Sequence, residues 1–454
     1  MEKSYAFRYN GIKVELIMDE NITLNLTNDE NPKKETLIKQ SVAEVETIKK
    51  EAVGKPEKVK RKKLPKELKP SKKWLALMII GIVGLIGGIS CLAFVFLMPE
   101  KSNPELAFPK IPSKNTGEET YSSLTGEILP DPSLKNAPAY CIQTPNGLDG
   151  ARPQSGLNEA GVIFEAIAEA GITRFASIYQ NPGASVIGPI RSLRLYYLEW
   201  DTPFDCTIVH AGGADDAIAA VSSGGYKDLS EDYQYMYRGT YGSRLWNNLF
   251  TTSAYLKQFS SSHGYDTSDI KGFSRLTPDE SEKVRVNESV KEKLEITTPT
   301  TENTSSVSVK IPSVSLRFGG YDSFNVDYTY DEKSNKYLRS YGSGVDHEVY
   351  ECSQEDLGER NPEDVCKLTQ LTPSVVVAIM VNERKASDNY HEDITTTGSG
   401  NAYIFQNGGV IEGTWSKPTR DDQITFSDKN GKEIKLAPGQ TFVSAIPNYG
   451  SIEY

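Results

Sequence analysis

The chain has 454 residues, of which 38% are hydrophobic and 24% charged, and its formal net charge is -11. This length suffices for two ordinary domains with cores of their own. Because basic residues are concentrated before residue 74, the rest of the chain is more acidic than the total indicates, which excludes nonspecific nucleic-acid binding.

Residues 1–73 open with the alternating stretch YAFRYNGIKVELIM, which suits a small hairpin, and then become polar and rich in lysine. Few aromatic residues and a lysine run are typical of disordered segments. The sequence therefore predicts a basic, largely disordered tail.

The apolar run from Trp74 to Met98 carries no charged side chain and is long enough to cross a bilayer as one helix. Lysines crowd the segment before it, whereas few basic residues follow Pro99. Since short basic flanks resist translocation, we expect a single-pass helix held by membrane lipid, with a cytoplasmic N-terminus and everything after Pro99 outside.

The sequence leaves two alternatives to a permanent anchor. A cleaved signal peptide is disfavoured because the apolar run begins only at residue 74. Cys91 resembles a lipid-attachment cysteine, but more apolar residues follow it, and Gly88 stands where such signals prefer a larger aliphatic residue. We favour Cys91 as an ordinary buried thiol.

Residues 99–137 are rich in proline, serine and lysine, which predicts a linker. A first domain over residues 138–290 then alternates strands with helices, as an α/β layer does. Its expected strands are AYCIQT, TRFASIYQ and CTIVHA, and its expected helices begin near Asn158, run from Pro189 to Trp200, and cover ADDAIAAV.

Residues 300–454 change character, because several strand-like runs are separated there by Gly, Asn and Asp turns. KNGK, inside QITFSDKNGKEIKL, is a strong signal for a two-residue hairpin turn. The sequence therefore predicts a mainly β second domain, and an α+β fold for the protein as a whole.

Four cysteines fall beyond the membrane run, and sequence alone cannot choose among their three pairings. Cys352 and Cys366 close a short polar loop, so we favour a disulfide between them. Cys141 and Cys206 lie in strand-like runs, and either a bond between neighbouring strands or two buried free thiols stays open.

Glu165 and Glu169 are four residues apart in the helix expected from Asn158, so both carboxylates would project from one side. They are weak candidates for a catalytic acid or base. The simpler interpretation is a solvated face, or ion pairs with nearby arginines.

Pro189 suits the first turn of a helix, and Arg191 and Arg194 would lie together near its free amides. Such an arrangement holds carboxylates or phosphates. With Arg152 and Arg174 nearby in sequence, an anion pocket and a structural network of ion pairs remain equally open.

His210 ends an expected strand and precedes the small-residue turn AGGADD. Ligands of α/β folds bind at such strand ends, so His210 is a candidate for binding and, weakly, for catalysis. No catalytic motif gives it a mechanism, and the four scattered histidines suggest neither a metal site nor a cofactor.

The blocks ARPQSGLNEAGVIFEAIAEAGITRFASIYQ, GPIRSLRLYY and VHAGG, followed by NLFTT, GSGNAYIFQNGGVIEGTWSKPTRDDQITF and PGQTFVSAIP, resemble the YerB-like family of bacterial envelope proteins. The resemblance covers about residues 137–454. It implies a two-domain extracytoplasmic protein of unknown function, commonly tethered by a lipidated cysteine. This chain departs from that pattern in its membrane run, its N-terminal tail, and Asn247, where the family carries histidine.

The resemblance places a site in the first domain without naming its chemistry. The expected ligand-binding residues are Arg152, Gln154, Arg174, Arg191, Ser192, Arg194, His210 and Gly212. Pro153, Ser155, Gly156 and Thr173 fall in the same blocks, as do Glu165 and Glu169.

Three hypotheses for function follow. The first is a membrane-anchored module of the cell envelope that binds an anionic group on a wall component or partner protein. The second is a hydrolase of envelope glycan or peptide, although two carboxylates on one helix are poorly placed to flank a substrate bond. The third is a scaffold whose C-terminal domain contacts another envelope protein.

Overall fold

The computed structural model describes residues 3–9, 12–18 and 23–27, and then residues 119–239, 247–285, 311–352 and 361–454. The chain divides into two compact units, Met1–Ile111 and Pro112–Tyr454, each of which is described by itself. None of the helices in these described ranges is long and apolar enough to cross a membrane. The apolar run from Trp74 to Met98 and Cys91 lie outside the described residues.

The first unit contains a three-stranded antiparallel sheet built from β1 (Lys3–Tyr9), β2 (Ile12–Met18) and β3 (Thr23–Thr27). β1 and β2 form the hairpin that the alternating N-terminal stretch predicts. β3, which the sequence analysis did not anticipate, pairs with β2.

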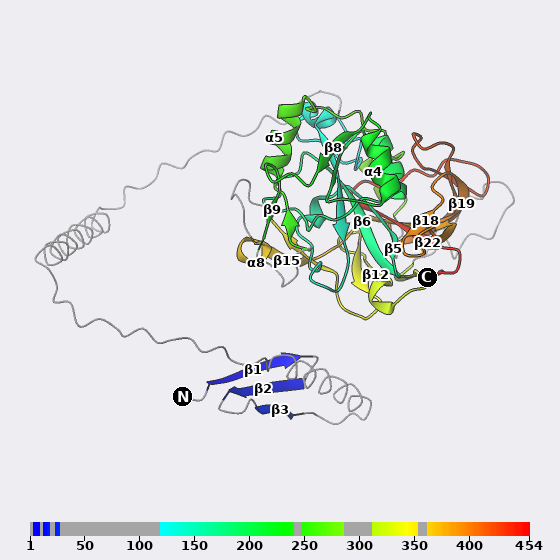
Figure 1. The fold of residues 1–454 in the computed structure, drawn as a ribbon. Coiled ribbons are helices and arrows are strands. Elements are labelled where there is room, and N and C mark those ends of the chain that lie inside the picture. The colour runs from blue at the N-terminus through cyan, green and yellow to red at the C-terminus, as the bar shows by residue number, and fades with distance from the viewer. Residues whose placement is uncertain are drawn as a thin grey trace, which may run out of the picture. The chain divides into compact units, whose positions relative to one another are not determined.

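A ten-stranded mixed sheet forms the centre of the second unit (Figure 1). Strands from both sides of the expected domain boundary contribute to it, five from each side in two adjacent blocks, and that boundary, near residues 290–300, lies outside the described residues. In spatial order the strands are β21 (Thr425–Asp428), β20 (Gly409–Lys417), β19 (Gly398–Gln406), β16 (Val375–Val381), β22 (Thr441–Pro447), β5 (Val162–Glu169), β6 (Ile172–Gln180), β4 (Ala139–Pro145), β7 (Thr207–His210) and β8 (Lys227–Ser230).

The late strand β22 joins the two halves of this sheet, because it pairs in parallel with β16 on one side and with β5 on the other. These three strands read as nearly continuous apolar runs and are buried along almost their whole length. Such runs are typical of strands covered on both faces.

One face of the sheet is covered by α3 (Leu195–Asp201) and α4 (Asp215–Ser222). The opposite face carries α5 (Ser253–His263) over β4 and β6, and a four-stranded sheet over β16 and β22. That smaller sheet runs β13 (Lys336–Tyr341), β12 (Val326–Asp331), β11 (Ser313–Arg317), β23 (Ser451–Glu453). The unit is therefore layered, as the α+β expectation requires, and its second half is mainly β.

Three two-stranded antiparallel sheets and two short α-helices also belong to the described part of this unit. They are β9 (Tyr237–Arg238) with β10 (Leu249–Phe250), β14 (Glu348–Glu351) with β15 (Lys367–Gln370), β17 (Glu383–Lys385) with β18 (Glu392–Ile394), α6 (Pro278–Lys283) and α8 (Pro362–Val365).

One of the expected helices is wrong, a second begins six residues later than expected, and ADDAIAAV forms α4 as predicted. Residues 157–159 form a single 3₁₀ turn, after which the chain continues as β5 rather than as a helix. A run that is apolar on both faces fits a central strand as well as a buried helix, and the neighbours β22 and β6 decide between them. α3 begins only at Leu195, and residues 189–194 before it are not helical.

Two disulfides link cysteines of the second unit. Cys352 is bonded to Cys366, the pair that the short polar loop favours. Cys141 is bonded to Cys206, so the alternative of two free thiols is wrong. This second bond is possible because β4 and β7 are adjacent parallel strands.

Candidate functional site

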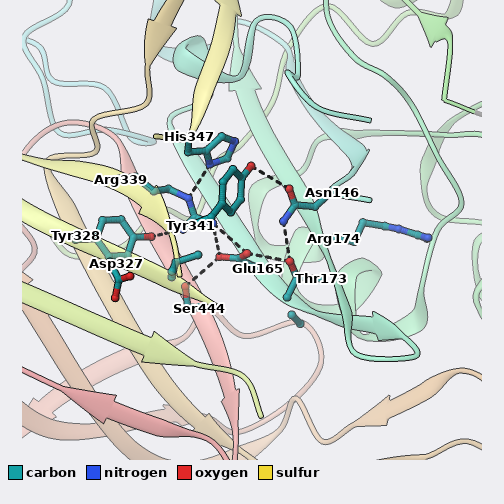
Figure 2. A network of polar contacts seen from close by, with 12 residues as sticks. Asn146, Glu165, Thr173, Arg174, Asp327, Tyr328, Arg339, Tyr341, His347 and Ser444 are labelled. Carbon is teal, nitrogen blue, oxygen red and sulfur yellow. Dashed lines mark hydrogen bonds and ion pairs between the residues drawn. The ribbon is translucent and has the colours of Figure 1, made fainter. Parts of the chain in front are cut away.

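Glu165 forms a fully buried ion pair with Arg339, a residue 174 positions further along the chain (Figure 2). Both side chains are 0% exposed, and Nη2 of the arginine lies 3.1 and 3.0 Å from the two carboxylate oxygens. The hydroxyls of Thr173 and Ser444 also donate to this carboxylate. Burial, opposed first by the arginine charge, raises the pKa of Glu165.

Arg339 also fixes the protonation state of His347. Its Nε donates to Nδ1 of the imidazole at 2.8 Å, so the ring proton sits on Nε2, which lies 3.0 Å from Oε1 of Gln154. Burial and the nearby arginine charges hold the pKa of His347 well below its usual range. The histidine is therefore neutral and links the Arg339 guanidinium to the Gln154 amide.

Asn146 continues the network into the first half of the chain. Its amide nitrogen donates to Thr173, and its side-chain oxygen accepts from Arg152, Gln154 and Tyr341. The Arg152 guanidinium stacks 3.6 Å from the centre of the Tyr341 ring. We call this assembly around Glu165 and Arg339 the buried network; it joins the first half of the chain to β13 and β22.

The loop that carries Arg152 and Gln154 is held by backbone hydrogen bonds. The amide of Ser155 donates to Gly188, and the amide of Gly156 donates to Tyr350. Gly156 has a φ of +71°, and a Cβ there would lie 2.9 Å from the oxygen of Val186. A glycine is therefore required at this turn.

Glu169 faces the opposite side of the sheet from Glu165, which corrects the expectation that both carboxylates project from one side. A β-bulge between Ile167 and Glu169 shifts the register by one residue, and successive strand residues point to opposite faces. Figure 2 accordingly shows Arg174 directed away from the contacts of its neighbour Thr173 with Glu165.

On its own face Glu169 is shared by two arginines. Nη2 of Arg174 lies 2.6 Å from one carboxylate oxygen, and Nη2 of Arg194 lies 2.6 Å from the other. Burial alone would raise the pKa of Glu169, but these two charges outweigh it and lower that pKa. Arg174 also donates to the carbonyl oxygen of Ser192.

Arg191 lies beside this group and differs from its neighbours in its contacts. Its guanidinium is half-buried and makes no hydrogen bond or ion pair with any described residue. Burial lowers its pKa, while the charges of Glu169 and Asp149 oppose that change. We call Arg174, Arg191 and Arg194, gathered around Glu169, the arginine cluster; it carries more positive charge than Glu169 neutralises.

A cleft of about 930 Å³ begins at Arg194 and extends between α3, the N-terminus of α4 and the β17–β18 hairpin. Most charged side chains along its walls are already paired with one another. These pairs are Arg384 with Asp393, Lys385 with Glu392, His391 with Asp388, and Arg420 with Glu199.

His210 stands apart from this cleft. It is 1% exposed, with Nδ1 2.8 Å from the oxygen of Gly212 and Nε2 3.0 Å from Asp228. Glu165 is likewise buried and fully engaged, so the structure gives neither residue access to a substrate. Among the described residues, no group of three or more His, Cys, Asp or Glu side chains is placed to hold a metal ion.

Sequence reasoning missed Arg339 and His347 as central residues. The strand KYLRSY did contain a signal, because Arg339 alternates in phase with Tyr337 and Tyr341, which marks a buried face. Nothing in the sequence showed which carboxylate this arginine would meet.

Both halves of the second unit match models of one family. Residues 124–266 match the model described as "Protein of unknown function (DUF3048) N-terminal domain", and residues 314–443 match its C-terminal domain. The chain belongs to this YerB-like family. The DUF3048 models thus cover the halves that contribute Glu165 and Arg339 to the buried network.

A relative from Bacillus subtilis (strain 168), described as "Putative lipoprotein YerB", is 24% identical over 363 residues, which are 79% of this chain and 95% of the relative. The crystal structure of YerB from Bacillus subtilis matches with a TM-score of 0.57 and 23% identity. That match covers 74% of this chain and 100% of the solved chain, and it shows the fold alone.

Proposed function

We propose that this chain is a membrane-anchored protein of the bacterial cell envelope whose second unit lies outside the membrane. The apolar run Trp74–Met98 and its basic N-terminal flank support this topology. A relative described as a lipoprotein supports the same side of the membrane. Two disulfides in the second unit also suit an oxidising compartment.

The second unit binds an anionic group at the arginine cluster. The observation that carries this proposal is Arg191, a half-buried guanidinium with no partner among the described residues, beside an already shared Glu169. A carboxylate or phosphate would supply the missing acceptor, since a guanidinium binds either group through two parallel hydrogen bonds.

The cleft gives the rest of the ligand a place to lie. It begins at Arg194 and falls within the usual size of ligand sites, about 300–1,000 Å³. Its polar walls suit a hydrophilic compound more than an apolar one. A wall fragment with one anionic group and a neutral remainder meets this description better than an acidic peptide, because Asp215 and Asp216 line the cleft without an ion-pair partner among the described residues.

Calorimetry on the full-length protein in detergent tests the site, with inorganic phosphate, soluble wall fragments and an acidic peptide as separate probes. Arg191→Gln should weaken binding of the true ligand class about tenfold or more, since a hydrogen bond to a charged group contributes about 1.5–3 kcal/mol. Arg317→Gln is the matched control, because this arginine is 30% exposed, pairs with Asp327 and does not line the cleft. Equal affinities of the parent and Arg191→Gln for every probe would rule out the anion site.

Topology is tested separately from binding. Protease applied to intact cells should digest the second unit and spare the lysine-rich tail. The reverse pattern would show that the orientation is backwards.

A hydrolase built on Glu165, Glu169 and His210 finds no support in this geometry. Glu165 and His210 are completely buried, and Glu169 is bound by two arginines. None of the three is placed to transfer a proton to a substrate.

A further inference from the structure

The N-terminus of α4 lies directly beside the arginine cluster. The oxygen of Leu193 accepts from the amide of Ala214, the residue before α4. Arg194 follows the first of these residues, and Asp215 and Asp216 follow the second. All three charged side chains line the cleft. The cleft therefore passes from a cation of the cluster to two carboxylates within a short distance.

The two carboxylates at the start of α4 are exposed and form no ion pair with a described residue. Asp215 forms no hydrogen bond there either, and Asp216 accepts only from the amide of Ala217. Their negative charges repel a second acidic group on any ligand whose first acidic group the cluster holds. Their free oxygens can only accept hydrogen bonds, so this wall favours a ligand that donates to it.

Another wall of the cleft supplies hydroxyl groups. Ser387, in the β17–β18 turn, and Thr395 and Thr397, after β18, line the cleft, and none of their hydroxyls forms a hydrogen bond with a described residue. A side-chain hydroxyl both donates and accepts. Sugar hydroxyls also donate and accept, so they match both walls. A ligand ammonium only donates, so it matches the aspartates and leaves the hydroxyl protons on the other wall without an acceptor.

We infer that the ligand of the proposed anion site is a sugar acid, a saccharide with a single carboxylate or phosphate that binds Arg191 and with hydroxyls that donate to Asp215. This inference rests on the proposed function, because it assigns the neutral part of the ligand at the same site. The cleft, of about 930 Å³, has room for a saccharide of more than one ring.

Calorimetry on the full-length protein in detergent tests this ligand class with four probes. N-acetylmuramate joins a carboxylate to a sugar ring, acetate is the carboxylate alone, N-acetylglucosamine is the sugar alone, and 6-aminohexanoate joins a carboxylate to an ammonium. We expect N-acetylmuramate to bind at least tenfold more tightly than each of the other three. Equal affinities for N-acetylmuramate and acetate, or tighter binding of 6-aminohexanoate, would overturn the inference while leaving the anion site intact.

Variants at the start of α4 separate the sugar contact from the anion contact. Asp215→Ala removes the acceptor and should weaken binding of N-acetylmuramate at least fivefold, while acetate binding stays equal or becomes slightly tighter. Asp215→Asn keeps an oxygen acceptor and should weaken N-acetylmuramate binding less than twofold. Asp279→Ala is the matched control, because Asp279 is also exposed in the first turn of a helix, α6, and does not line the cleft.

Arg191→Gln should weaken binding of both N-acetylmuramate and acetate, because it acts on the acidic group that the two probes share. If this variant binds both as the parent does, the anion site and the inference fail together. If it weakens both but Asp215→Ala binds N-acetylmuramate as the parent does, the inference alone is overturned.

Discussion

Replacing Arg339 with methionine removes the cation from the buried pair with Glu165 while keeping most of the side-chain volume. The carboxylate would keep only the Thr173 and Ser444 hydroxyls in a site that is 0% exposed. Leaving one member of a buried ion pair uncompensated costs about 3–5 kcal/mol. We therefore expect Arg339→Met to lower the free energy of unfolding by about that amount.

The double variant Glu165→Gln/Arg339→Met removes both charges and should lose less than the two single variants together. Residues in direct contact have interaction energies of about 0.5–3 kcal/mol, and this pair should lie in the upper part of that range. Urea unfolding followed by near-ultraviolet circular dichroism measures all four proteins. Both halves of the second unit should unfold in one transition, because the pair joins them.

Arg317→Met is the matched control for this cycle. Arg317 pairs with Asp327 at 2.7 Å, but both side chains are about one-third exposed, so the loss should stay below about 1 kcal/mol. Additive effects of Glu165→Gln and Arg339→Met, or a cost for Arg339→Met no larger than that of the control, would refute the reasoning.

Burial, joined by the nearby Glu392 charge, raises the pKa of Glu383 to about 7, so the folded state retains a proton there while the unfolded chain loses it near pH 4.5. Stability from this group is complete below pH 4.5 and disappears as the pH rises through 7. Relative to the parent, Glu383→Gln should therefore gain about 2–3 kcal/mol in free energy of unfolding as the pH rises from about 5 to about 8. A difference in stability between the two proteins that stays constant over this pH range would contradict the prediction. Burial also raises the pKa of Asp201 far above its usual range. One oxygen of this carboxyl has no hydrogen-bond partner among the described residues, and neither has Oε1 of Gln143. Asp201→Asn should therefore raise the free energy of unfolding at pH 8 by about 1–3 kcal/mol, and a destabilised variant would show that the carboxyl is needed. Replacing Cys141 and Cys206 with alanine opens a loop with a sequence separation of 65 and should lower the free energy of unfolding by about 4 kcal/mol. The variant is compared with the parent under oxidising conditions. Equal stability of the two proteins would mean that the bond does not form.

Strands with clear boundaries could be predicted from the sequence, because Gly, Pro and Asn punctuate them. AYCIQT, TRFASIYQ and CTIVHA became β4, β6 and β7, and the KNGK turn follows β21. The stretch that became β5 was mistaken for a helix, because its apolar residues occupy both faces. Its true state depends on β22, about 280 residues later, which no local pattern reveals.

The candidate site was predicted in composition but not in arrangement. Arg174 and Arg194 do form ion pairs with a glutamate, as the ion-pair interpretation expected. The bulge after Ile167 turns Glu169 to their side of the sheet, so they pair with Glu169 and not with Glu165. The partner of Glu165 comes from the other half of the chain. A single sequence contains the residue types of such a pair and not the pairing.

The position of β22 determines when the second unit can finish folding. Thr441–Pro447 lies between β5 and β16, so the strands made earlier have an open gap until this segment arrives. A chain synthesised from its N-terminus can pair β5, β6, β4, β7 and β8 early, but it cannot join the two halves of the sheet until β22 has been made. The segment that contains β22 therefore completes the central sheet. A nascent chain stalled before this segment would leave the apolar edges of β5 and β16 unpaired and exposed to other chains.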